Sequence, residues 1–296
     1  MPAPLLMIAA SFLFATMGVC VKFASATYDT AEIVFYRGLI GAIFMAALCR
    51  WRAIPLRTPV PAMHFWRSAS GVLALCLWFY AIAHLPLATA VTLNYMSSVW
   101  MALFLIGGSV LLARERIDGR LIATVLVGFA GVTLVLRPTI EQNQLWAGLM
   151  GLLSGMLSAM AYLQVTALGR AGEPEQRVVF YFSLGGMAAG AVAMAVQGTS
   201  PHTLNGVLLL VATGLLATVA QMLMTRAYAI GRTLSNASLQ YLGIVFSFSY
   251  GVWLFDDPVT ATALLGMLLI VVAGLAATLL RTRRGTSDST LPPPEP

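Results

Sequence analysis

Residues 34–37 read VFYR, and residues 179–182 read VFYF. A short polar stretch that contains acidic residues precedes each copy, and a long apolar run rich in glycine and alanine follows it. A second pair of similar segments keeps the same order, because WFYAIAH at 78–84 resembles TRAYAIG at 225–231. The sequence therefore predicts two similar halves. An arginine follows the shared VFY motif in the first half only.

The composition indicates a protein whose solvent is a bilayer. Hydrophobic residues make up 59% of the 296 residues and charged residues only 9%, whereas a soluble domain is about 25% charged. A soluble protein with this much apolar surface would aggregate. The formal charge of +6 does not indicate nucleic-acid binding, because the basic residues are scattered singly. Lipid is therefore an expected partner, and nucleic acid is not.

Ten stretches are apolar and long enough for helices that cross a membrane, which need about 20 residues. Prolines stand at most of the breaks between them, and proline is tolerated in the first turn of a helix but not inside it. The fold class is therefore an all-α membrane protein with ten transmembrane helices. The predicted spans are 5–25, 30–49, 63–83, 87–112, 118–136, 144–168, 177–197, 203–230, 233–255 and 259–280.

The arginines of the short loops predict the orientation of these spans. With a cytoplasmic N-terminus, twelve loop arginines lie inside and Arg137 alone lies outside. Both termini are then cytoplasmic. The short loops and the absence of an organelle signal favour a multi-pass protein of the cell inner membrane.

Each half holds five spans, and five is an odd number, so the halves enter the membrane from opposite sides. This is a 5+5 inverted repeat, an arrangement typical of transporters that work by alternating access. We place the first five-helix repeat at 1–137, the second at 138–284, and a disordered cytoplasmic tail, which is polar and rich in proline, at 285–296.

The ends of the two halves add a family resemblance. A short acidic motif, ARERID at 113–118 or LFDDPVT at 254–260, precedes a glycine-bearing helix in each. With ten spans and a duplication, the chain resembles the EamA-type members of the drug/metabolite transporter superfamily. The resemblance implies that helices one, three, four, six, eight and nine surround a central cavity and that helices five and ten are peripheral. It does not imply a substrate, since the superfamily handles amino acids, nucleosides, nucleotide sugars, organic anions and drugs.

Four basic residues are predicted to lie within the membrane: Lys22, Arg37, Arg67 and Arg226. A charge in hydrocarbon is expensive, so each is a candidate for function. Arg37 is the sharpest, because the second half has an uncharged residue at the equivalent place. Structural alternatives are an ion pair of Arg37 with Glu32 or Asp29, and an ion pair of Lys22 with Glu32. Lys22 and Arg67 could instead snorkel to the membrane surface. We treat Glu32 and Arg67 as gating or structural charges.

Polar and aromatic side chains on the cavity helices complete the predicted substrate site. Asn94 and Gln240 lie mid-helix at matching positions of the two halves. An amide in hydrocarbon needs a partner, so this pair either grips substrate or forms interhelical hydrogen bonds. The predicted substrate-binding residues are Lys22, Arg37, Trp78, Tyr80, Asn94, Tyr95, Tyr162, Arg226, Gln240 and Tyr241.

No aspartate or glutamate lies in the middle of a predicted span, so the basic residues favour an anion or the carboxylate of a zwitterion. The sequence predicts a secondary transporter of a small anionic or zwitterionic metabolite, such as an organic acid or an amino-acid-like compound, as a monomer or homodimer. The alternative is a broad exporter of amphipathic or aromatic compounds with structural basic residues. Catalytic motifs are absent, the three cysteines lack a metal-site spacing, and we expect no enzyme activity, cofactor or metal.

Overall fold

The computed structural model describes residues 2–101, 103–104, 144–230 and 239–288, together with 123, 126–128, 130–132 and 134. Every element named in this part of the chain is a helix. The helices are α1 (Ala3–Ala24), α2 (Thr30–Trp51), α3 (Pro61–His84), α4 (Leu87–Tyr95), α7 (Leu145–Arg170), α8 (Glu175–Gln197), α9 (Leu204–Ile230), α11 (Leu242–Phe255) and α12 (Ala261–Asp288).

Six of these helices, α1, α2, α3, α7, α8 and α9, are long and apolar enough to cross a membrane. They coincide with the first three and the sixth to eighth predicted spans. Their boundaries follow local chemistry: Pro61 opens α3, and Pro174 stands directly before α8, since a proline at a helix start lacks only an N–H that has no partner there. The fifth predicted span, 118–136, lies mostly outside the described residues.

Three predicted spans differ from the structure. The ninth, predicted as one helix over 233–255, is interrupted by a turn at Tyr241, after which α11 begins. The fourth span, predicted as one helix over 87–112, is interrupted by a turn at Met96, after which helical backbone resumes. The last helix continues to Asp288, past the predicted start of the tail at residue 285. Propagating an existing helix by one turn needs no new nucleus, so the polar residues after Arg284 extend it. Residues 289–296 lie outside the part of the chain that the structure describes.

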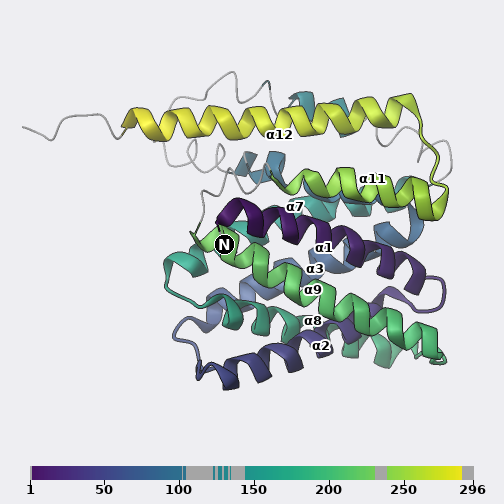
Figure 1. Ribbon diagram of the computed structural model, residues 1–296, viewed down its shortest axis with the longest axis vertical. Helices are drawn as coiled ribbons and strands as arrows, with labels where there is room; N and C mark the ends of the chain where they lie inside the picture. Colours follow the sequence, from purple (N-terminus) through teal and green to yellow (C-terminus); the bar gives the residue numbers. More distant parts are fainter. Residues whose placement is uncertain are drawn as a thin grey trace, which may run out of the picture.

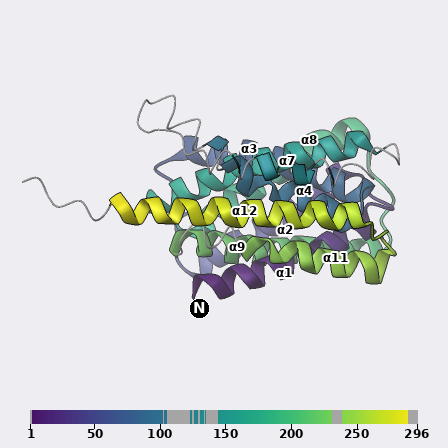
Figure 2. The same ribbon diagram turned by 90° about the horizontal axis from the view of Figure 1, so that it is seen from above.

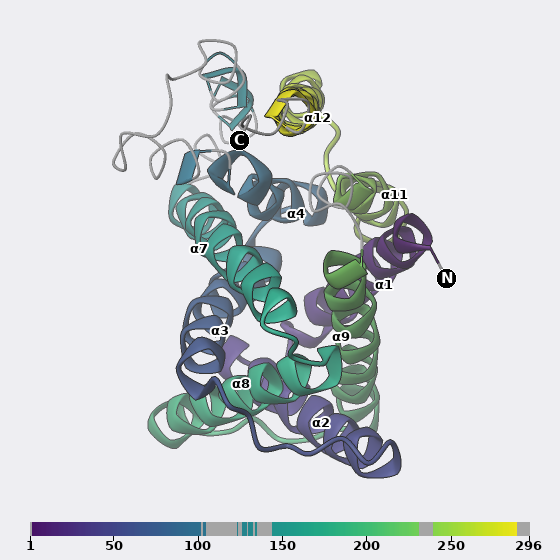
Figure 3. The same ribbon diagram turned by 90° about the vertical axis from the view of Figure 1, so that its left-hand side faces the viewer.

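The helices run side by side along one axis (Figure 1). Viewed along that axis, α3, α7, α4, α11, α1, α9, α2 and α8 surround a common centre, and α12 lies outside them (Figure 3). The most extensive contacts join helices far apart in the sequence: α2 packs along α8, α3 along α7, and α1 along α9. Figure 2 shows α12 running across one outer face of the bundle. This layout brings both halves of the chain to the central space.

Glycines allow two of the closest helix contacts. A Cβ atom built at Gly155 would lie 2.6 Å from the backbone oxygen of Leu93, and one built at Gly190 would lie 2.6 Å from the backbone nitrogen of Phe35. Only a residue without a side chain fits such approaches between membrane helices. Gly186, on the same helix as Gly190, has no atom nearer than 4.0 Å to its built Cβ. The close crossing of α8 with α2 therefore depends on particular glycines.

Candidate functional site

A cavity of about 50 Å³ lies at the centre of the bundle. Seven helices and Gln240, which precedes α11, contribute to its wall. No acidic residue is found among the described residues that line it. The lining residues are Phe14, Met17, Arg37, Arg67, Gly71, Ala74, Leu75, Trp78, Asn94, Tyr95, Ser158, Ala161, Tyr162, Phe182, Gln221 and Gln240.

Two arginines give the cavity its charge. Arg37 on α2 and Arg67 on α3 are only 4% and 3% exposed. Their guanidinium carbons lie 4.9 and 4.2 Å from the ring centroid of Phe182, at the distance of a cation–π contact. The Nε atom of each arginine, and Nη1 of Arg67, is buried without a hydrogen-bond partner. Within the described part of the chain, no carboxylate forms an ion pair with either arginine.

Phe182 reaches Arg37 because α2 and α8 cross closely. A Cβ atom built at Gly38 would lie 2.7 Å from the backbone oxygen of Ser183, so the residue after Arg37 contacts the residue after Phe182. The two motifs VFYR and VFYF thus face each other across the helix pair. The last position of the motif differs between the halves, and both of its residues, Arg37 and Phe182, line the cavity.

The amides and tyrosines around the cavity are held by neighbouring helices. Asn94 Nδ2 donates to Ser154 Oγ at 3.0 Å and to Ser158 Oγ at 3.1 Å, which is the interhelical hydrogen bond that the sequence left as an alternative. Tyr162 stacks on Tyr228 with ring centroids 5.8 Å apart. These contacts fix the wall between α4, α7 and α9.

The side chain of Arg67 does not extend to the surface, contrary to the snorkelling alternative. Its side chain points into the protein and lines the cavity, although it belongs to the first turns of α3. Six predicted substrate-binding residues line the cavity with it: Arg37, Trp78, Asn94, Tyr95, Tyr162 and Gln240.

The other predicted site residues lie outside this wall. Arg226 is 52% exposed in its side chain and pairs with Glu175 at 3.0 Å. Tyr80 stacks on His84 with centroids 4.2 Å apart and lines a separate groove. Tyr241 is buried but is not among the residues of the cavity wall.

Lys22 and Glu32 lie at one end of the bundle and do not pair with each other. The Lys22 ammonium donates to the backbone oxygen of Leu85 at 2.7 Å and lies 3.4 Å from Asp257. Asp257 in turn accepts from the backbone N–H of Leu87 at 2.8 Å. We call Lys22, Leu85, Leu87 and Asp257 the Asp257 contacts. Nearby in the fold, Glu32 accepts from the backbone N–H and the hydroxyl of Ser200 at 2.9 and 2.7 Å.

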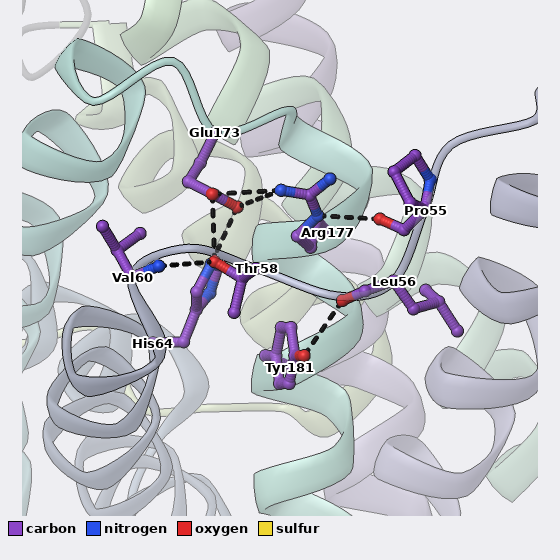
Figure 4. Close-up of polar contacts among 8 residues, drawn as sticks. All are labelled: Pro55, Leu56, Thr58, Val60, His64, Glu173, Arg177 and Tyr181. Atoms are coloured by element: carbon purple, nitrogen blue, oxygen red, sulfur yellow. Dashed lines mark hydrogen bonds and ion pairs between the residues drawn. The ribbon is translucent and has the colours of Figure 1, made fainter.

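The opposite end holds a buried charge network around Glu173 (Figure 4). Its carboxylate accepts from Thr58 Oγ1 at 3.0 Å, from His64 Nε2 at 2.9 Å and twice from Arg177 Nη1 at 3.0 Å. Arg177 Nε also donates to the backbone oxygen of Pro55 at 3.0 Å. We call Thr58, His64, Glu173 and Arg177 the Glu173 network. It joins the link between α2 and α3 to the link between α7 and α8.

The network also sets the charge state of its carboxyl. Burial alone raises the pKa of Glu173, but hydrogen bonds from His64, Thr58 and Arg177 outweigh this and bring its pKa below the usual carboxyl value. The carboxylate is therefore ionised at neutral pH and holds both links.

Sequence reasoning missed the Glu173 network and Ser158. The loop charges of the network gave no sign that two distant links meet. Ser154 and Ser158 did leave a signal, because two hydroxyls four residues apart on an apolar helix mark one face. No group of three potential metal-ligating residues occurs within the described chain.

Comparison with known proteins agrees with this architecture. The family model described as the EamA-like transporter family matches residues 1–137. A protein named as a pseudopaline exporter of Pseudomonas aeruginosa is 36% identical over 95% of this chain and 96% of its own length. A riboflavin transporter of Rhizobium johnstonii is 28% identical, covering 91% of this chain and 88% of that protein.

A solved crystal structure, 20% identical, matches with a TM-score of 0.66 over 95% of this chain and 98% of that one, which supports the fold alone. The 36% identity to the exporter extends over nearly the full length of both chains and shows the family. The chain belongs to the EamA-like transporter family and is a multi-pass membrane transporter of small metabolites.

Proposed function

We propose that this protein is a secondary transporter that moves a small anionic or zwitterionic metabolite through the central cavity by alternating access. One observation carries the proposal: Arg37 and Arg67 are buried in the cavity wall with unpartnered nitrogens and without an acidic neighbour in the described lining. A buried charge without a partner is strongly unfavourable. An anionic ligand would supply the missing partner.

The packing of the helices supports a 5+5 inverted repeat. Exchanging the two halves turns α1 into α7 and α3 into α9, so that the contact of α1 with α9 becomes the contact of α7 with α3. Both contacts are extensive, and α2 packs against α8, its own counterpart. In addition, α7 ends where α1 begins, at the end of the bundle that holds the Glu173 network (Figure 1). Such repeats place the substrate site between their halves.

The two ends of the bundle provide the gates that alternating access needs. The Glu173 network and the Asp257 contacts each join residues of both halves, and the cavity lies between them. By the arginine distribution, the Glu173 network faces the cytoplasm and the termini are cytoplasmic. We place the protein in the inner membrane, with large apolar side chains such as Trp51 and Trp253, each 80% exposed, facing lipid.

A thermal-shift screen of the detergent-purified protein tests the proposal. The panel holds di- and tricarboxylates, phosphorylated metabolites, amino acids, lipophilic cations and neutral aromatic compounds. A ligand that binds the folded state raises Tm. We expect anions or zwitterions to raise Tm, and Arg37→Gln to weaken their binding by about 1–3 kcal/mol, the contribution of a hydrogen bond to a charged group.

Arg170→Gln is the matched control, because Arg170 is exposed at the end of α7 and should leave the shifts unchanged. If only cations or neutral aromatic compounds raise Tm, and Arg37→Gln leaves the shifts intact, the anion proposal is wrong. The site would then belong to a broad exporter of amphipathic or aromatic compounds, bound by Trp78, Tyr95 and Tyr162.

A further inference from the structure

Among the buried polar atoms of the cavity wall that have no hydrogen-bond partner, donors outnumber acceptors. Besides Arg37 Nε and the two Arg67 nitrogens, the indole N–H of Trp78 is buried without a partner. Arginine and tryptophan side chains can only donate, so turning the side chain cannot remove the surplus. Gln240 Oε1 is the unpartnered acceptor in the described lining. The ligand that completes this wall must be rich in acceptors.

The two guanidinium groups also act on a common space. Both lie against the ring of Phe182, at 4.9 and 4.2 Å, so their separation cannot exceed the sum of these two distances. The aromatic ring attracts both cations but carries no net charge and cannot neutralise them. Glu32, the buried acid on the same helix as Arg37, is occupied by Ser200 at the end of the bundle. The described wall therefore carries two positive charges that its own residues leave uncompensated.

We propose that the cavity selects a substrate with two anionic groups, one for each guanidinium, over a substrate with one. This inference rests on the proposed function and narrows its substrate class from anions and zwitterions to dianions, chiefly dicarboxylates. A single carboxylate would neutralise one guanidinium and leave the other buried and unpaired. A second carboxylate within reach pairs it, and Trp78 and Gln221 can donate to the remaining carboxylate oxygens. Charge-assisted hydrogen bonds of this kind are the strong ones.

The test compares ligands that differ in one charge and hardly in shape. Succinate, glutarate and adipate are each measured beside their monoamides, and L-glutamate beside L-glutamine, by calorimetry and thermal shift on the purified full-length protein. We expect at least one dicarboxylate to bind about ten- to a hundredfold more tightly than its monoamide. In Arg37→Gln and in Arg67→Gln this preference should fall to about threefold or less, because one cation remains.

The Tm of each ligand-free variant serves as a control for folding. Removing a buried unpaired charge should raise Tm of the ligand-free Arg67→Gln protein, whereas the loss of a structural arginine would lower it. Arg170→Gln should keep both the preference and the Tm.

The outcomes separate this inference from the proposed function. If acid and monoamide bind equally well and Arg37→Gln weakens both, the site takes a monoanion or zwitterion: the dianion inference is wrong and the proposed function stands. If neither Arg37→Gln nor Arg67→Gln changes the affinity, or if no member of the panel binds, the dianion inference and the proposed function are both wrong. Preference for the diacid that is lost in each arginine variant supports the dianion.

Discussion

The two ends of the bundle are held together in different ways. At one end, the Glu173 network concentrates four hydrogen bonds on one carboxylate whose side chain is 2% exposed. At the other end, Lys22 and Asp257 are 3.4 Å apart with side chains 17% and 14% exposed. Buried, multiply bonded pairs are costly to break, whereas partly exposed pairs contribute little. We therefore expect the Asp257 end to open with the smaller change in free energy.

The largest predicted effect comes from removing the charge at the centre of the Glu173 network. Glu173→Gln leaves Arg177 without its anionic partner in a buried place, and breaking such a pair costs about 3–5 kcal/mol of stability. Thermal unfolding in detergent measures this loss. The matched change at the other end, Asp257→Asn, should cost less, because the Lys22–Asp257 pair is longer, at 3.4 Å, and more exposed. Equal losses at the two ends would contradict the comparison.

A smaller effect should follow from acid at the end that holds the Glu173 network. The pKa of Glu173 is lower in the folded protein than the ordinary value of 4.5. Its contribution is then fully present above pH 4.5 and is lost as the pH falls through the lower, folded-state pKa. The Tm difference between wild type and Glu173→Gln should be constant from pH 7 to 5 and shrink only below about 4.5. A difference that shrinks already between pH 7 and 6 would show that another group controls the network.

A third predicted effect, smaller than that of Glu173→Gln, tests the close packing toward the Asp257 end. Gly190→Ala places a methyl group 2.6 Å from the backbone nitrogen of Phe35, and such overpacking costs about 1–3 kcal/mol. Gly186→Ala on the same helix meets nothing nearer than 4.0 Å and should be neutral or slightly stabilising. Unfolding midpoints of both variants measure the contrast. Similar midpoints would mean that α8 can shift away from α2 without loss.

Hydropathy predicted most of the fold, because an apolar run of about 20 residues has few solutions other than a spanning helix. It could not predict the break at Met96, because residues 87–106 contain no glycine, proline or charge that would mark the end of a helix. The family assignment from the repeated ends of the two halves is confirmed by the comparisons. The inverted repeat is a proposal that the helix contacts support, and the orientation is a proposal that rests on the arginine distribution.

The candidate site was only partly predictable, because depth along a helix does not say which way a side chain points. Arg37 and Arg67 are both basic residues on predicted spans, yet position alone suggested the surface for Arg67, and the structure places it in the cavity wall. Position likewise made Arg226 a candidate, and the structure directs it to Glu175. The partner of Lys22 depended on where the link between α11 and α12 folds back, which no local pattern records.

The contact between Arg37 and Phe182 also bears on how such a protein could arise. The two residues hold equivalent places in the repeated motifs, and they meet across the crossing of α2 and α8. An ancestor with two identical halves would have set arginine against arginine, or phenylalanine against phenylalanine. The first would repel itself and the second would attract no anion. On the proposed duplication, the pairing of one guanidinium with one ring arose after the two copies had begun to diverge.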